Sequence, residues 1–348
     1  MKRAILFTVL SCTAVFVSAQ RNIEIGFAGG VTHYYGDLGN WDGPVQWNSA
    51  RPAFSVTARD FFNNPKRYVT RALTLEGRLS WHRIGYDETE PTGGKSGLEL
   101  YNYNRGLNFR TDLFGASAHL VLNAYREPYQ PLFQQRFFAY FYVGAGIYYG
   151  RPKADLFRGE ADMSNAYFHW DDGTLRDQEQ YTPGAVNASV VERDGKYETD
   201  LYSWHTEGGW GDSEGNNVQR TSPWHFGLPL GFGLRYMLTK QMSVGAEFSY
   251  IYFISDKIDD VSDRYSTYEE IGDAFPTDST QQFLARYVSD PSGFGSDGTT
   301  GIKTSRRGNP GLPDYFSYLM VEVSYKFKRG IGKRSFLSVR KSKSTVQK

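Results

Sequence analysis

The chain has 348 residues, of which 40% are hydrophobic and 16% aromatic, with 37 glycines and 25 tyrosines. A disordered chain would contain fewer hydrophobic and aromatic residues. The mean hydropathy of −0.52 shows that the chain is too polar for a bundle of transmembrane helices. The formal net charge is only +1, so the distribution of charge along the chain is more informative than its sum.

The first predicted segment is a signal peptide over residues 1–19. A basic start containing Lys2 and Arg3 precedes an apolar run and a small-residue cleavage site that ends at Ala19. An alternative interpretation places a lipid on Cys12, but the LSC sequence has a large residue where a small one is preferred. Cleavage after Ala19 removes the only cysteine and leaves an exported chain without disulfides or thiol chemistry.

Alternation with a period of two residues is the strongest pattern in the remaining chain. In residues 73–82, Leu75 and Leu79 share one face with other apolar residues, and Glu76 and Arg78 share the opposite face with polar ones. A helix would mix these two sets. The same pattern predicts eight strands, over residues 22–35, 52–61, 73–82, 109–123, 137–149, 224–238, 242–253 and 318–327.

Strand length and loop asymmetry favour an outer-membrane barrel over a soluble sandwich. A tilted strand needs about ten residues to cross a bilayer, and these strands are long enough. Short links follow the second, fourth and sixth strands, whereas residues 151–222 and 255–314 form long loops. We therefore expect an all-β fold, an eight-stranded antiparallel transmembrane β-barrel with two long outer loops, over residues 20–327. Parity places both termini in the periplasm of a Gram-negative cell.

The charge distribution agrees with this orientation. Residues 151–222 contain seven basic and fourteen acidic residues, and residues 255–314 contain six and eleven, so both predicted outer loops are acidic. Residues 328–348 form a basic tail without any acidic residue. An exported tail meets no nucleic acid, so we expect it to bind a protein partner or phospholipid. The predicted periplasmic basic surface includes Lys328, Arg329, Lys333, Arg334, Arg340 and Lys341.

Charged residues on the inward faces are predicted to fill the lumen. An eight-stranded barrel has room only for side chains, and unpaired buried charge is costly, so we expect paired charges. Conduction of protons or ions is the alternative. In this network Glu76 is expected to pair with Arg78 or Arg235. The predicted members are Glu24, Arg59, Glu76, Arg78, His119, Arg235, Glu247, Glu322 and Lys326.

One inward face also carries a hydrolase-like set. Glu76, Ser80 and His82 could act as orienting acid, nucleophile and base, as in lipid-modifying barrels. Ser80 and His82 would lie about 7 Å apart on one strand face, which is longer than a hydrogen bond. We therefore expect no catalytic residue and a protein that is not an enzyme.

An acidic segment follows the seventh predicted strand and could hold calcium. It contains Asp256, Asp259, Asp260 and Asp263 but lacks the alternating Asp-x-Asp-x-Asp-Gly loop that wraps the ion. We interpret it as an acidic solvated turn. The sequence thus predicts neither a metal nor a cofactor.

Four stretches together resemble one family. They are YYGDL at residues 34–38, YIYFISDKIDDVSDRY at 250–265, RGNP at 307–310 and VSYKF at 323–327. Their order and position resemble the PorG family, outer-membrane barrels of the type IX secretion system of Bacteroidota, over essentially the whole mature chain. The loop over residues 151–222 is longer than the family pattern requires. The resemblance rests on Tyr34, Tyr35, Gly36, Asp37, Asp256, Asp259, Asp260, Arg307, Gly308, Asn309 and Pro310.

The resemblance implies a role without catalysis. Such a protein would anchor or contact the periplasmic ring of PorK-type lipoprotein and PorN-type protein, and would support export of cargo with C-terminal sorting domains. A passive structural barrel or small pore, and a lipid-modifying enzyme, are the alternative functions.

Two short motifs are also given positions in the membrane. Tyr34 and Tyr35 are expected in the outer aromatic girdle, where their rings contact lipid headgroups, and Gly36-Asp37 begins the first outer loop. Tyr325 and Phe327 are interpreted as the signal that the barrel assembly machinery reads on the last strand.

Overall fold

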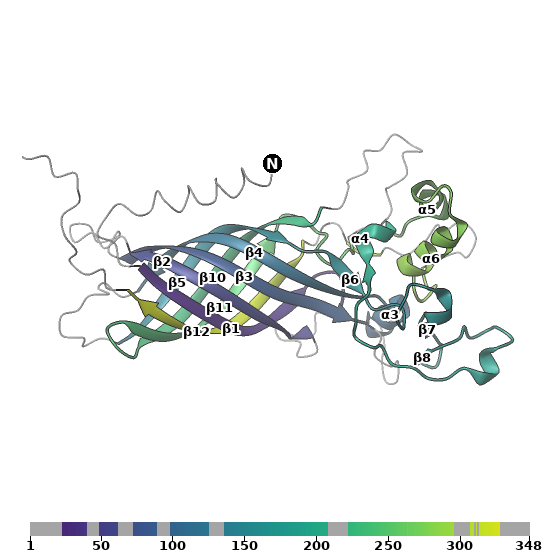
Figure 1. Ribbon diagram of the computed structural model, residues 1–348, viewed down its shortest axis with the longest axis horizontal. Helices are drawn as coiled ribbons and strands as arrows, with labels where there is room; N and C mark the ends of the chain where they lie inside the picture. The colour runs from purple at the N-terminus through teal and green to yellow at the C-terminus, as the bar shows by residue number, and fades with distance from the viewer. Residues whose placement is uncertain are drawn as a thin grey trace, which may run out of the picture.

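The computed structural model describes residues 23–39, 49–61, 72–88, 98–124, 136–207, 222–262, 264–295, 307–309, 311 and 313–327. The predicted signal peptide, Asp263, Pro310 and the basic tail lie outside these residues. Figure 1 shows a barrel of long strands, and the strand pairing counts eight of them in the described residues. They are β1 (Ile23–Tyr35), β2 (Arg51–Phe61), β3 (Leu73–Asp87), β4 (Asn108–Asn123), β5 (Phe137–Tyr149), β10 (Trp224–Met237), β11 (Met242–Phe253) and β12 (Tyr315–Lys326).

The strands close into one antiparallel barrel. Their order is β3-β2-β1-β12-β11-β10-β5-β4, and pairing of β3 with β4 completes the ring. The β1–β12 seam joins the first and last strands, with Glu24 opposite Lys326 and Tyr35 opposite Tyr315. The predicted eight-stranded antiparallel barrel is therefore confirmed, with each strand boundary close to its expected position except at β3, which extends to Asp87.

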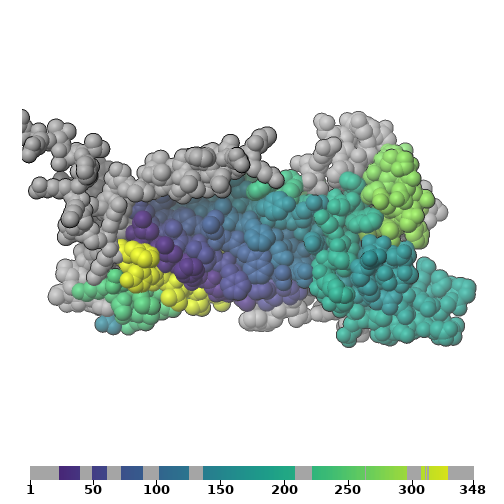
Figure 2. Space-filling model, viewed as in Figure 1, coloured from purple at the N-terminus to yellow at the C-terminus, as the bar shows by residue number. Residues whose placement is uncertain are grey.

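The two ends of the barrel differ, and we name them by their connections. The turn end holds the start of β1, the end of β12 and the short β10–β11 connection. The loop end holds the connections that follow β1, β3, β5 and β11. At the loop end, the long connections form a cap, visible as a broad head in Figure 2.

The cap is built from short helices and strands. Strand β4 pairs with β6, and β6 pairs with β9, so the barrel sheet continues into the cap. Local signals begin two of its helices: Thr267 and Glu270 form a capping box at α5, and the Asp278 side chain accepts the Thr280 and Gln281 amides at α6. The cap elements are α3 (Leu98–Arg105), β6 (Pro152–Ala154), η2 (Met163–Asn165), β7 (Phe168–His169), β8 (Leu175–Arg176), η3 (Ala185–Asn187), β9 (Thr199–Asp200), α4 (Leu201–Trp204), α5 (Tyr268–Ala274) and α6 (Ser279–Ser289).

The outer surface of the barrel is an apolar belt. Phe27 and Leu79 are each 66% exposed, as expected for side chains that face lipid rather than a protein core. At the loop end, the Tyr35 ring stacks on the Tyr315 ring with 5.0 Å between centroids. At the turn end, the exposed rings of Tyr325 and Phe327 meet edge to face at 5.0 Å. Aromatic rings thus border the belt at both ends, which is the arrangement of an outer-membrane barrel.

The lumen is filled differently in its two halves. Near the turn end it holds the predicted charged side chains, whereas near the loop end it holds large apolar and aromatic ones. The prediction of a lumen filled by paired charges is therefore right for one half only. The apolar half includes Ile84, Leu113, Ile251, Phe253 and Phe316, and it is continuous with the buried core of the cap.

Candidate functional site

Arg59 is the centre of the lumen network. Its terminal nitrogens donate to both carboxylate oxygens of Glu322 at 2.6 Å and to Glu24 at 3.1 Å. Its Nε donates to Glu76 at 2.5 Å. These partners lie on β1, β3 and β12, so one guanidinium from β2 ties together three other strands.

Arg78 extends the network toward β11. It donates to Glu76 at 2.7 Å and to Glu247 at 2.5 Å, and the Tyr140 and Tyr142 hydroxyls donate to Glu247 at 2.9 Å. The predicted pairing of Glu76 with Arg78 is thus confirmed.

Arg235 does not pair with Glu76, so the second partner that the sequence suggested for Glu76 is wrong. It lies nearer the turn end and donates to Glu24 at 3.2 Å and to Glu322 at 3.4 Å. Lys326 is buried beside this group, opposite Glu24 in the β1–β12 register. His119 contacts Glu76 through Nδ1 at 2.9 Å, so the structure brings all nine predicted residues into one buried region.

The hydrolase-like set is not assembled as a hydrogen-bonded triad. Ser80 and His82 both point into the lumen, but neither Ser80 Oγ nor either ring nitrogen of His82 has a hydrogen-bond partner among the described residues. The His82 ring instead packs against Phe316 and Tyr318, with centroids 5.0 and 5.1 Å away. Glu76 is occupied by Arg59, Arg78 and His119.

Most of the described residues in the first three family-like stretches meet where the cap joins the barrel. We name this group the mouth cluster; it comprises Tyr34, Asp37, Asp256, Asp259, Asp260, Arg307 and Asn309, together with Glu88, Arg105, Thr206, Glu207 and Asp314. They come from distant segments of the chain, which no local pattern in the sequence places together.

Tyr34 does not lie in the aromatic girdle, where the sequence predicted it. Its side chain is 3% exposed and points into the barrel mouth, where its hydroxyl donates to Asp259 and its ring meets Phe109 edge to face at 4.8 Å. Of the two tyrosines, Tyr35 alone occupies the girdle. The period-two pattern could have distinguished them, because Tyr34 has the same parity as the inward-facing Glu24.

Asp37 connects the first loop to the 307–309 segment. Its Oδ2 accepts the Asn309 amide at 2.8 Å, and its carbonyl accepts Arg105 Nη2 at 2.7 Å. Arg105 also donates to the Arg307 carbonyl at 2.7 Å and to both oxygens of Glu88, at 2.5 and 3.0 Å. Burial raises the pKa of Asp37 to about 6, although the Asn309 amide and Arg105 oppose the shift.

Arg307 holds the opposite side of the mouth cluster. It donates to Glu207 at 2.6 Å and to the Asp260 carbonyl, and it lies 3.5 Å from the Asp260 carboxylate. The Thr206 hydroxyl also donates to Asp260. Burial raises the pKa of Asp260 to about 7, against the opposing charge of Arg307. Asp260 has a φ of +62°, a conformation that Asp and Asn tolerate better than most residues.

The acidic segment is not the solvated turn that we expected from the sequence. Asp259 is 0% exposed and accepts the Val261 amide at 2.9 Å, and Asp314 is equally buried and accepts the Ile258 amide at 3.0 Å. Burial raises the pKa of both carboxyls. Burial also raises the pKa of the half-buried Asp256 to about 7, with Asp37 adding to the shift. The reason for the error is tertiary: the cap covers this segment with residues distant in sequence.

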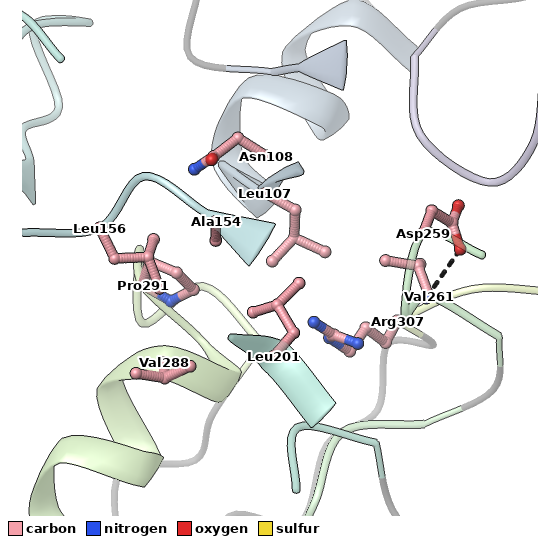
Figure 3. Close-up of a pocket in the computed structure, with 10 residues that line it drawn as sticks. All are labelled: Leu107, Asn108, Ala154, Leu156, Leu201, Asp259, Val261, Val288, Pro291 and Arg307. Atoms are coloured by element: carbon pink, nitrogen blue, oxygen red, sulfur yellow. Dashed lines mark hydrogen bonds between the residues drawn. The ribbon is translucent and has the colours of Figure 1, made fainter. Parts of the chain in front are cut away.

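A small cavity of about 10 Å³ lies beside this cluster. Figure 3 shows Arg307 and Leu201 facing it from different segments, with the hydrogen bond between Asp259 and the Val261 amide at its edge. A volume of this size matches about one water molecule. Within the described residues, the mouth cluster is therefore a packed joint with a cavity beside it that matches about one water molecule.

Several members of this joint had no signal in the sequence. Glu88, Thr206 and Glu207 lie in loops, and Arg105 ends the short helix α3. Only their burial in the folded cap distinguishes them, so sequence reasoning could not have found them.

Comparisons with known proteins give matches of low similarity only. No protein-family model and no curated protein matches the chain. A major outer membrane protein from Thermus thermophilus has 10% identity and a TM-score of 0.36, covering 89% of this chain and 100% of that one. Ail of Yersinia pestis, in complex with sucrose octasulfate, has 13% identity and a TM-score of 0.31, covering 88% and 97%. OprG from Pseudomonas aeruginosa has 10% identity and a TM-score of 0.31, covering 89% and 96%.

The fold assignment rests on the strand pairing itself rather than on these scores. The ring closes through the β3–β4 and β1–β12 ladders, and the outward faces are apolar. In the part of the chain that the structure describes, no helix is long and apolar enough to span a membrane.

Proposed function

We propose that the protein is a non-catalytic outer-membrane barrel component of the type IX secretion machinery, which contacts a periplasmic ring of PorK-type and PorN-type proteins. The observation that carries this proposal is the convergence of the family-like motifs. Tyr34, Asp37, Asp259, Asp260 and Arg307 all lie in the joint that fixes the cap to the barrel. These five family-like residues therefore take part in the contacts between cap and barrel.

The filled lumen supports an anchoring role over a pore. Arg59 and Arg78 bridge strands across the half near the turn end, and Ile251, Phe253 and Phe316 fill the half near the loop end. A barrel of this kind acts through its two end surfaces. The packing of His82 against Phe316 and Tyr318 likewise supports a structural lumen rather than an active site.

The turn end is the surface that we assign to the ring. Strand parity and the short connections favour a periplasmic position for this end, as in other outer-membrane barrels. Arg136 and Lys240 lie there, and the basic residues 328–348 follow β12 in the sequence. The acidic loop end would face outward, away from a ring beneath the membrane.

The test is a cross-linking pulldown from membranes with and without residues 330–348. We expect the truncated barrel to assemble normally but to recover less ring protein. The difference in recovery between the full-length and the truncated protein should shrink at higher salt, because exposed charges are screened within about 8 Å at physiological ionic strength. Unchanged recovery would mean that the tail only binds phospholipid headgroups, and would contradict the assignment.

A matched control replaces residues 178–188 of the cap with a short Gly/Ser linker. This segment includes η3 and the exposed Val186, and the exchange leaves β9 and α4 in place. Ring recovery should be unaffected. Loss of co-purification in this variant alone would place the working surface at the loop end instead.

A further inference from the structure

Three carboxylates meet in the cap, away from the mouth cluster. Asp155 directly follows β6, and Asp194 and Glu198 lie in the turn that precedes β9. One carboxylate oxygen from each residue lies within 4.8 Å of the other two. Among the described residues, neither Asp155 nor Glu198 forms a salt bridge with a basic side chain. The lumen acids differ, since Glu322, for example, pairs with Arg59.

The local fold forces these charges together. The β6–β9 ladder ends with the pair Ala154 and Thr199, so Asp155 and Glu198, the residues just beyond this pair, lie close together. Gly195 turns the chain with a φ of +73°, and its amide donates to Asp155 Oδ2 at 2.6 Å. Like charges directly opposite each other destabilise a ladder, so the arrangement needs a compensating partner.

Two buried oxygens in this group have no partner within the described residues. Asp155 is 1% exposed, and its Oδ1 accepts no hydrogen bond. Glu198 Oε1 accepts the Leu156 and Phe157 amides at 3.0 and 2.9 Å, whereas the buried Oε2 accepts none. Leaving buried acceptors unpaired is unfavourable. Burial, with added repulsion from Glu198 and Asp194, raises the pKa of Asp155 to about 6.

We propose that Asp155, Asp194 and Glu198 form a binding site for a divalent cation of the calcium class. All three offer oxygen donors, which hard cations prefer, and no nitrogen or sulfur ligand is among them. The cation would use the two unpaired oxygens and clamp the 193–198 turn to the start of the cap at β6. A site on an exported surface with three carboxylates is expected to bind calcium at about 10⁻⁴–10⁻³ M.

Two neighbouring cations bear on this site. Lys196 Nζ binds Asp194 Oδ2 at 2.6 Å, but its side chain is 69% exposed and can leave without breaking a buried contact. Arg193 donates to the Asp155 carbonyl and lies 3.6 Å from Asp87, so it holds the backbone of the site. We therefore expect Lys196 to compete with the cation, and Lys196→Gln to strengthen calcium binding.

The experiment uses the full-length protein in detergent, treated with EDTA and dialysed. Terbium is the luminescent probe, excited through tyrosine, because the Tyr167 hydroxyl accepts the Asp194 amide at 3.0 Å and lies beside the site. We expect sensitised luminescence that calcium displaces, and a calcium isotherm by titration calorimetry. Asp155→Asn and Glu198→Gln should each lower calcium affinity about tenfold or more, because ligand charge sets the affinity.

Stability provides a second readout that does not depend on terbium. Without calcium, Asp155→Asn should raise the thermal midpoint of the cap, since it removes a repelling charge, and it should abolish the stabilisation that calcium gives. The matched control is Glu192→Gln in the same loop, at a position outside the cluster. Its response to calcium should equal that of the natural protein.

The proposal is overturned by either of two results. One is a natural protein that neither binds calcium nor gains thermal stability at about 10 mM, well above the expected range. The other is an Asp155→Asn or Glu198→Gln variant that keeps the natural affinity. Neither result depends on the secretion role, because ring recovery is measured separately.

Discussion

At Glu76 a single buried carboxylate accepts hydrogen bonds from two guanidinium groups and one imidazole. The donors are Arg59 at 2.5 Å, Arg78 at 2.7 Å and His119 at 2.9 Å. Removing one partner of a buried ion pair is far more harmful than replacing both, because the remaining charge stays desolvated. Loss of Glu76 would therefore destabilise the barrel mainly by leaving Arg59 and Arg78 buried without this counter-charge.

We expect Glu76→Gln to lower the free energy of unfolding by about 3–5 kcal/mol, because Arg59 and Arg78 would lose a buried counter-charge. Urea unfolding in detergent, followed by the shift of the folded band on unheated gels, measures this change. The matched control is Asp112→Asn, which breaks the half-exposed pair with Arg83 at 2.7 Å. That pair should be worth about 0–1 kcal/mol. Equal effects of the two variants would show that the lumen network is not structural.

At the scale of elements, the β1–β12 seam is the contact that closes the barrel between the two ends of the chain. Gly30 on β1 packs directly on the backbone of β12, where an added Cβ would lie 2.7 Å from Met320 Cα. Backbone atoms cannot move aside as a flexible side chain can. The close approach of β1 to β12 therefore requires glycine at this position.

Gly30→Ala is expected to weaken this seam and to reduce the fraction of folded barrel recovered from membranes. Gly77→Ala is the control, because it makes the same chemical change within β3 at a point where an added Cβ meets no atom within 4 Å. Folded-band intensity on unheated gels compares the two. If Gly30→Ala assembles as well as Gly77→Ala, the seam tolerates a wider spacing than the structure shows.

The joint between cap and barrel should respond to pH. Burial raises the pKa of Asp260 from 3.8 to about 7, so the protonated carboxyl is favoured in the folded joint. For an acid with a raised pKa, the folded state loses stability as pH rises above the unfolded value, and the loss is complete above the folded value. We therefore expect the thermal midpoint of the cap to fall as the pH rises from about 4 to about 7, as measured by tryptophan fluorescence.

Asp260→Asn should flatten this pH dependence while leaving the cap folded, because Asn tolerates the positive φ at this position. The slope that remains in this variant would come from the other acids whose pKa burial raises, among them Asp37 at about 6, Asp155 at about 6 and Asp256 at about 7. An unchanged slope in the variant would rule out Asp260 as a contributor.

At the scale of the whole molecule, the lumen is blocked in two successive layers. The charged layer near the turn end joins strands across the barrel, and the apolar layer near the loop end is continuous with the core of the cap. Opening a path would require breaking both layers. The protein is therefore expected to behave as a closed cylinder with two working ends.

In planar lipid bilayers the purified protein should show no stable conductance steps, because both layers fill the lumen with side chains. A general porin reconstituted in parallel provides the positive control. Regular conductance steps from the natural protein would support the small-pore function instead and would require that the lumen network rearranges.

The sequence by itself determined the barrel, because each signal for it is local. Side chains alternate between the two faces of every strand, so Glu76, Arg78 and the other lumen charges could be placed inward from parity alone. The lengths of the connections also predicted that one end of the barrel carries short turns and the other long loops. The sequence did not determine which acid pairs with which basic residue, because pairing depends on how the eight strands are staggered around the ring. Arg235, for example, contacts Glu24 and Glu322 instead of Glu76.

Only the tertiary structure decided the character of the loops. The sequence around Asp259 and Asp260 predicts a solvated turn, yet they are buried because segments up to 225 residues away cover them, as the contact between Tyr34 and Asp259 shows. The same holds for Asp155 and Glu198, which the β6–β9 ladder brings close together. Loops carry no periodic pattern that reports burial, so their contacts arise from the packing of the whole cap and not from any local stretch of residues.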